Sequence, residues 1–172
     1  LNEMGVKFLG VQLSTGQLRE VARDMLSTGW RLARGMADWQ GLADGLLAAA
    51  RLLQGCADRC TAMSGRLPWE MASQIEFGFK EVPDLLVRVS NEPLAALDSV
   101  AMMSPEFPRL RERLLKICRR AEGFRSTLPE PGSVRWVESG GAVRLVQAPL
   151  DIATTVQARL LTAPAESPGG LT

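Results

Sequence analysis

The sequence of 172 residues contains no histidine and no tyrosine. These absences remove the commonest general base, the commonest zinc ligand and the phenolic acid from any candidate catalytic site. The sequence also lacks a GxxxxGK[ST] phosphate-binding loop, a DEAx box, a GxSxG elbow and an HExxH helix. We therefore expect no catalytic, cofactor-binding or metal-binding residue in this chain and no enzymatic activity of the chain in isolation.

Cysteines are few, long apolar runs are missing, and neither sign of charge dominates. The chain has three cysteines, and its 20 basic and 19 acidic residues give a net charge of +1. An odd, small number of cysteines favours reduced thiols and a cytoplasmic location. No uncharged run of 18 apolar residues and no secretory leader occur, so no membrane partner is expected. Because the charge is balanced overall, any nucleic-acid surface must be local.

What the chain has in quantity is helical periodicity. Ser14 followed by Gln17 forms a capping-box pattern that begins a helix, which Gly35 ends. A second helix is predicted from Asp38 to about residue 63, antiparallel to the first, with Gly65 after its end. At 46% hydrophobic residues, the chain has enough apolar surface for one core, so we expect one domain, or one domain with an appendage.

Prolines divide the middle of the chain. A short helix is predicted near residues 69–73, and Pro83 opens another helix that Pro93 breaks or kinks before residues 94–102. The helix over 104–126 has the best-defined apolar face. Two prolines in residues 128–132 then prevent helical continuation.

The last quarter of the chain predicts a β-hairpin. Residues 134–138 and 142–147 alternate apolar and polar side chains, and Gly140 and Gly141 are expected to supply the positive φ of a tight turn. A helix over about 150–161 and a loose tail over 164–172 are predicted to follow. The fold class is therefore mainly α: a bundle or arch of antiparallel helices with one C-terminal β-hairpin followed by a helix.

The helix over 104–126 is also the most basic part of the sequence. It contains seven basic and three acidic residues, a local net charge of +4. Four of its basic residues recur at i, i+4, i+7 and i+11 and are candidate contacts for a DNA backbone: Arg109, Arg113, Lys116 and Arg120. The alternative is a solvated outer face with local ion pairs.

Cysteine and tryptophan suggest two further sites, each with a simpler interpretation. Cys56 and Cys60 are one helical turn apart, but with only Cys118 and no histidine besides, they favour small core residues over a metal site. The four tryptophans are better explained as core than as base-stacking platforms. Two of them, Trp39 and Trp69, stand near helix starts and are expected to be half exposed.

Three segments together resemble one family. The pattern Trp136-x-Glu138, a glycine pair and Leu145-x-x-x-Pro149-Leu150 resembles the segment before motif III of DinG-type helicases, bacterial relatives of the XPD-like iron–sulfur DNA helicases that include the YoaA-like branch. Residues 8–15, FLGVQLST, with Gln17-Leu18 resemble the stretch after the DEAH box in YoaA-like helicases. A weaker likeness covers residues 56–59, CADR.

The resemblance implies that the chain is the arch domain, the helical insertion between helicase motifs II and III. A DEAH box would lie just before Leu1 and motif III beyond Thr172. Residues 1–13 would connect from the motor domain, 14–128 would form the arch, 129–163 would return to the motor, and 164–172 would be a flexible tail.

The parent protein implied by the resemblance is an ATP-dependent 5′–3′ DNA helicase that acts in DNA repair. It would use ATP, Mg and a 4Fe–4S cluster, none of them held by this chain. The arch would help to enclose single-stranded DNA, binding it weakly in isolation, and would pack near the motor and iron–sulfur domains of the same chain. The alternative is a non-enzymatic helical scaffold or adaptor that binds protein partners through an apolar groove near Met71, Ile75, Phe77 and Phe79.

Overall fold

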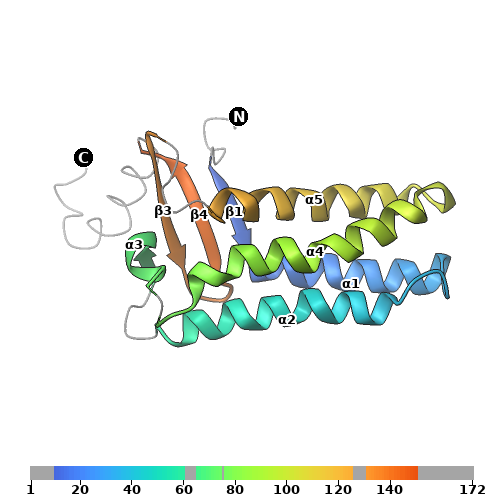
Figure 1. Ribbon diagram of the computed structural model, residues 1–172, viewed down its shortest axis with the longest axis horizontal. Helices are drawn as coiled ribbons and strands as arrows, with labels where there is room; N and C mark the ends of the chain where they lie inside the picture. The colour runs from blue at the N-terminus through green and yellow to red at the C-terminus, as the bar shows by residue number, and fades with distance from the viewer. Residues whose placement is uncertain (1–9, 61–64, 75, 126–130, 151–172) are drawn as a thin grey trace, which may run out of the picture.

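Four long helices lie side by side and antiparallel in up-and-down order (Figure 1). The computed structural model describes residues 10–60, 65–74, 76–125 and 131–150. With 18 to 20 residues each, the helices are about 27–30 Å long. They are α1 (Thr15–Leu32), α2 (Trp39–Asp58), α4 (Val82–Ser99) and α5 (Glu106–Arg125). Shorter elements are α3 (Trp69–Ala72) and the 3₁₀ turns η2 (Phe79–Glu81) and η3 (Ala101–Met103).

Both of the first two helices start where the sequence predicts, and a side chain caps each of them. The Ser14 side chain accepts from the Gln17 backbone N–H, and the Gln17 side chain accepts from the Ser14 backbone N–H, which confirms the capping box. Asp38 caps α2 by accepting from the Gly41 N–H at 3.1 Å. The pairing of α1 with α2 as an antiparallel hairpin is also confirmed.

The end of the bundle farthest from the sheet is held by an aromatic contact. The Trp39 ring stacks on Phe107 with 5.9 Å between centroids, and its Nε1–H donates to the Ala33 carbonyl at 2.9 Å. Gly29 of α1 faces this ring, and a Cβ built there would lie 2.4 Å from it. Only glycine therefore allows α1 to approach Trp39 this closely.

The structure differs from the predicted course of two helices, α2 and α4. Helix α4 continues through Pro93, so the break is wrong, and the alternative of a kink stays a prediction. A proline removes one backbone donor, yet Pro93 is buried in the bundle, and packing on both sides of it holds the helix together. Helix α2 ends at Asp58, earlier than the predicted residue 63, and residues 61–64 lie outside the described part of the chain.

A four-stranded antiparallel sheet closes the other end of the bundle, in the order β1-β4-β3-β2. The predicted hairpin is confirmed as β3 (Ser133–Glu138) and β4 (Arg144–Pro149). Strands β1 (Val11–Ser14) and β2 (Arg66–Pro68), which were not predicted, add one edge each. Gly140 and Gly141 do not have positive φ. The loop between Glu138 and Arg144 spans five residues, and loops of that length do not need the left-handed conformations of a two-residue turn.

Alternation along the strands gives the sheet two apolar faces. Leu13, Val137 and Leu145 belong to the large core shared with the helices. On the opposite face, Trp136, Val146 and Ala148 form a second, small cluster.

Strands β1 and β4 are the first and last of the described chain, and they are neighbours. Val11 pairs with Gln147 and Ser14 with Arg144, so the start of β1 lies beside the end of β4. In the sequence, the described helices α1 to α5 therefore all lie between two strands that are neighbours in the sheet.

Several predicted segments lie outside the described residues: the connection over 1–9, the helix beyond Leu150 and the tail over 164–172. Among the helices that are described, none has the length and apolar character required to cross a bilayer.

Candidate nucleic-acid interface

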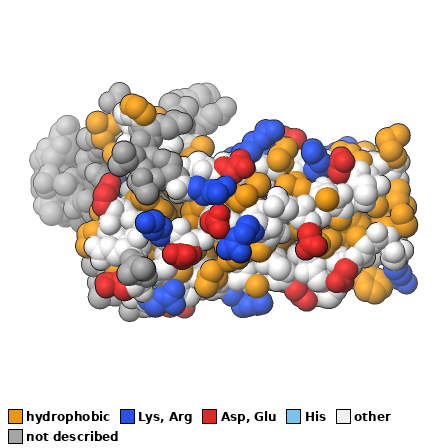
Figure 2. All heavy atoms as spheres, in the orientation of Figure 1, with side chains coloured by type: hydrophobic (Ala, Val, Ile, Leu, Met, Phe, Trp, Pro, Cys, Tyr) orange, Lys and Arg blue, Asp and Glu red, His pale blue; other side chains and the backbone are white. Residues whose placement is uncertain are grey.

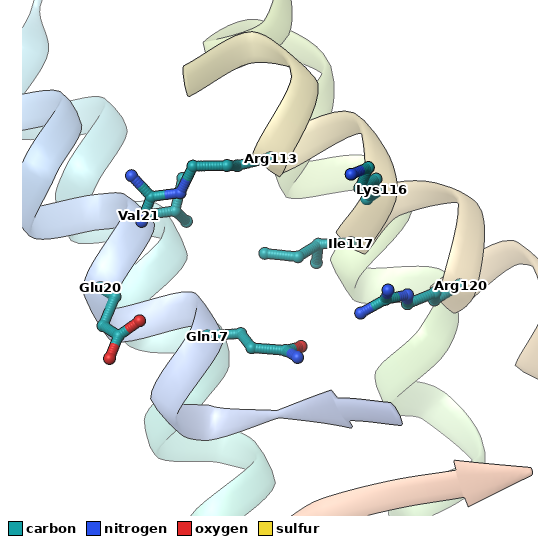
Figure 3. Close-up of a pocket in the computed structure, with 7 residues that line it drawn as sticks. All are labelled: Gln17, Glu20, Val21, Arg113, Lys116, Ile117 and Arg120. Carbon is teal, nitrogen blue, oxygen red and sulfur yellow. The ribbon is translucent and has the colours of Figure 1, made fainter. Parts of the chain in front are cut away.

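A groove between α1 and α5 brings the predicted basic residues together. Figure 3 shows its first pocket, of about 160 Å³, where Arg113 and Arg120 extend from α5 toward α1. Ile117 points into the space between the helices, and Gln17 points back from α1. The lining residues are Gln17, Glu20, Val21, Arg113, Lys116, Ile117 and Arg120.

The groove continues along the helices into a second pocket of about 290 Å³. Arg113 lines both pockets, and Arg109 lines the second. Each of the four sequence-predicted residues therefore lines at least one of these two adjacent pockets, which together we call the α1/α5 groove. We call this set, Arg109, Arg113, Lys116 and Arg120, the α5 stripe.

Carboxylates line the same groove. Glu20 and Asp24 come from α1 and Glu106 from the start of α5. The Arg113 Nη1 donates to Asp24 Oδ2 at 2.9 Å, and both side chains are about half exposed. No local pattern indicates this pairing, because the two residues are 89 positions apart.

Another member of the α5 stripe has a structural contact. Arg120 donates from Nη1 to the Gln12 carbonyl at 3.0 Å and so ties α5 to strand β1. Among the residues that the structure describes, the side chains of Arg109 and Lys116 have no hydrogen-bond or ion-pair partner. These two side chains are the members of the stripe most available to an external anion.

The local charge of +4 on α5 is reduced further by α4. Arg111 lies 3.6 Å from Asp98, and Arg125 lies 3.3 Å from Asp84. On the face drawn in Figure 2, blue and red side chains alternate over the helices without forming an area of one sign. Two positive charges of α5 are therefore compensated by carboxylates of α4.

The tryptophans are distributed differently from the prediction. Trp39 and Trp69 are 3% and 4% exposed, so the expectation that they are half exposed is wrong. Trp39 stacks on Phe107, and Trp69 packs at 5.8 Å from Phe124, because each helix start faces the core. Trp136 is also buried, whereas Trp30 is 47% exposed and has the Arg34 guanidinium 4.8 Å from its ring centroid.

Trp30 belongs to a second basic set that the sequence analysis missed. Arg19, Arg23 and Trp30 recur at i, i+4 and i+11, which places them on one face of α1, and Arg34 follows the end of the helix with its guanidinium over the Trp30 ring. We call these four residues the outer ridge. Its three arginines have no ion-pair or hydrogen-bond partner among the described residues. The helical spacing of Arg19, Arg23 and Trp30 is the signal in the sequence that could have identified this set.

The cysteines lie in the interior of the molecule. All three are buried free thiols. Burial raises the pKa of each thiol above its ordinary value, although the Arg59 guanidinium, 3.4 Å from the Cys56 Sγ, acts in the opposite direction on that residue. The described residues contain no group of three or more histidine, cysteine or acidic side chains placed to hold a metal ion.

The apolar groove expected for a scaffold protein does not form as predicted. Phe79 is fully buried in the main core and Phe77 is half-buried against it, whereas Met71 is 41% exposed. Ile75 lies outside the described residues. Exposed apolar side chains instead gather at the end of the bundle far from the sheet, on the right in Figure 2. They are Trp30, Met36, Met102 and Met103.

We compared the chain with protein-family models, curated proteins and solved structures, and none of them matches it.

Proposed function

We propose that this chain is the arch domain of an ATP-dependent DNA helicase of the DinG/YoaA kind, a cytoplasmic DNA-repair enzyme. The observation that carries this proposal is the pairing of β1 with β4 at one end of a four-helix body. ATP, Mg and a 4Fe–4S cluster would be bound by other domains of the parent protein. The chain itself contributes a rigid helical wall.

An insertion must leave its parent domain and return to it at nearly the same place. Here Val11 and Gln147 are directly opposite each other on neighbouring strands. The strands supply the two crossings, and the four helices form the inserted arm. This arrangement fits the resemblance of the same two segments to the flanks of helicase motifs II and III.

The sheet end also has an unsatisfied polar group. Arg66 stacks on Trp136, with its Cζ 4.6 Å from the ring centroid, and donates from Nη2 to Glu138 at 3.2 Å. Its Nε and Nη1 are buried without a partner among the described residues. Because an unpaired buried donor is unfavourable, an acceptor from the motor domain would stabilise this end of the molecule.

The α1/α5 groove supplies the proposed contact with single-stranded DNA. Lys116 and Arg109 would bind phosphates, and Arg113 would exchange Asp24 for a phosphate oxygen. Because Glu20, Asp24 and Glu106 lie in the same groove, the isolated chain should bind weakly. Weak, sequence-independent binding suits a wall along which a strand must move.

Two tests address this proposal. The gene that encodes the chain should specify a DEAH-type box just upstream of Leu1, and an unrelated domain there would overturn the helicase assignment. In a low-salt titration with single-stranded DNA, Arg113→Glu combined with Lys116→Glu should weaken binding about tenfold and flatten its salt dependence. Arg51→Glu, an exposed position on α2, is the matched control. Equal affinities for all three proteins would remove the groove from the proposal.

One observation favours a scaffold as a second candidate. The exposed apolar side chains at the far end of the bundle include Met102, which is 98% exposed, and methionine-rich surfaces adapt to varied protein partners. A scaffold would show no affinity for single-stranded DNA at low salt. It would instead retain a protein partner that Met102→Glu releases.

A further inference from the structure

We propose that the outer ridge of α1 binds an unpaired DNA strand, with one base stacked on Trp30 and the backbone following the three arginines. This inference rests on the proposed function, because it extends the same strand contact beyond the α1/α5 groove. It adds a stacking platform, which the groove does not have.

The first step in the argument is geometric. The 11-residue interval from Arg19 to Trp30 corresponds to about 16 Å of helix axis, and Arg34 lies just beyond the end of α1. Arg23 and Arg34 are exposed, and Arg19 is half-buried. A single strand lying along α1 would therefore meet several guanidinium groups in succession.

The second step concerns the charges around these arginines. No ion pair holds Arg19, Arg23 or Arg34 within the described part of the chain, in contrast to Arg113. The nearest carboxylates on the same helix, Glu20 and Asp24, line the neighbouring groove, and Asp24 is already paired. The ridge can therefore bind phosphates without first breaking an internal ion pair.

The third step concerns Trp30. It is the one tryptophan of the four whose ring is open to solvent, since Trp39, Trp69 and Trp136 are all at most 4% exposed. An indole face beside arginines is the combination that binds unpaired bases without sequence preference. Arg34 already occupies part of the Trp30 ring surface by a cation–π contact, and this contact orients the guanidinium next to the place where a base would stack.

A pocket beside Trp30 provides space for the base. It measures about 280 Å³ and lies where α1 ends and α2 begins. Arg34 and Gln40 contribute polar groups to it, and its one carboxylate, Asp38, is engaged as the cap of α2. The lining residues are Trp30, Arg34, Gly35, Ala37, Asp38, Trp39 and Gln40.

The outer ridge adjoins the α1/α5 groove on α1. Glu20 lines the groove and Arg23 lies on the ridge, one helical turn along α1. A strand bound on the ridge and a strand bound in the groove would therefore contact neighbouring faces of the same helix.

The test uses the full chain with an oligothymidylate of about 12 nucleotides and with an abasic strand of the same length. The parent protein should show partial quenching of tryptophan fluorescence with the normal strand and much less with the abasic strand. Trp30→Leu should lower affinity for the normal strand about tenfold and leave affinity for the abasic strand unchanged. Trp30→Phe should retain most of the affinity but lose the quenching, because the remaining tryptophans are buried.

The outcomes separate this inference from the proposed function. Equal affinity of the parent and Trp30→Leu for the normal strand, with binding still weakened by Arg113→Glu and Lys116→Glu, would overturn the ridge and leave the groove. Loss of affinity for the abasic strand in Trp30→Leu would overturn the stacking role. Absence of binding to either strand at low salt would overturn both. Because Trp30 is exposed, its variants should melt at the temperature of the parent, which checks their folding.

Discussion

The α5 stripe and the outer ridge of α1 both gather basic side chains along one long helix, yet their surroundings differ. In the stripe, Arg113 is paired with Asp24 and Arg120 is bound to the backbone of β1. In the ridge, the arginines have no such partners among the described residues, and one exposed tryptophan accompanies them. Helical spacing therefore places cations on one face, but the neighbouring helix decides how many of them remain available.

The α5 stripe and the outer ridge differ mainly in the negative charges near their arginines. An exposed ion pair contributes little to stability, roughly 0–1 kcal/mol, because water and salt screen it. The same pair nevertheless competes directly with an incoming phosphate for the arginine. We therefore expect the ridge to supply more of the salt-dependent affinity than the stripe, although the stripe has more basic residues.

The largest expected effect tests the packing beneath the ridge. Gly29→Ala places a Cβ against the Trp39 ring and should lower the free energy of unfolding by about 2 kcal/mol. Gly45→Ala is the matched control, since no atom lies within 4 Å of the added carbon there, and it should raise stability by up to about 1 kcal/mol. Urea denaturation gives both values. Stabilisation by Gly29→Ala would contradict the described position of α1.

The next test uses the inward face of α5, opposite to the stripe. Burial raises the pKa of the Cys118 thiol, and of Cys56 and Cys60. The folded state therefore holds these protons more tightly than the unfolded state does. The free energy of unfolding should be unaffected below the unfolded thiol pKa, near 9, and should decrease as the pH rises above it.

A thiol-reactive dye at pH 8 checks the same burial independently of stability. All three thiols should react about 100-fold more slowly in the native protein than in urea. Rapid labelling of Cys118 in native protein would mean that α5 is rotated and that the stripe does not face the groove.

Another variant frees Arg113 of the α5 stripe from its ion pair, as the arginines of the outer ridge are. Asp24→Asn removes the partner of Arg113 and should increase affinity for single-stranded DNA about two- to threefold at low salt. Asp44→Asn, on the exposed side of α2, is the control and should change nothing. A decrease in affinity with Asp24→Asn would show that the ion pair positions Arg113 for DNA instead of competing with it.

The smallest expected effect concerns the pair that joins α1 to α5 near Trp30. Arg31 Nη2 lies 2.8 Å from Glu106 Oε1, with both side chains substantially exposed. Glu106→Gln should lower stability by about 0.5 kcal/mol or less, and Arg31, then unpaired, should slightly strengthen DNA binding. Loss of more than about 2 kcal/mol on thermal or urea unfolding would indicate a role in the packing of the helices.

The sequence was sufficient for the parts of the fold that depend on local chemistry. The Ser14 and Asp38 caps and the alternation in the hairpin each arise from residues close in sequence. Strands β1 and β2 have only four and three residues, too few for a period of two to be recognised. The continuous course of α4 through Pro93 depends on packing against other helices, which no local pattern indicates.

The candidate site divides in the same way. The helical spacing of the α5 stripe was readable in the sequence, whereas the pockets that its residues line depend on the packing of α1 against α5. The ion pair between Arg113 and Asp24 was not predictable, because it joins residues far apart in the sequence. The residues of the outer ridge could be found in the sequence. Its importance, however, depends on the exposure of Trp30, and only the structure shows that Trp30 is exposed whereas Trp39 and Trp69 are buried.

The salt dependence of DNA binding by two double variants tests the central claim most directly. For a single strand, each lost phosphate contact reduces the slope of log K against log salt by about 0.7. Arg23→Gln with Arg34→Gln should therefore reduce the slope by about 1.4, and Arg113→Gln with Arg120→Gln should reduce it by less than half as much. An equal or greater reduction from the second pair would contradict the account, because the stripe would then be the main contact despite its carboxylate neighbours.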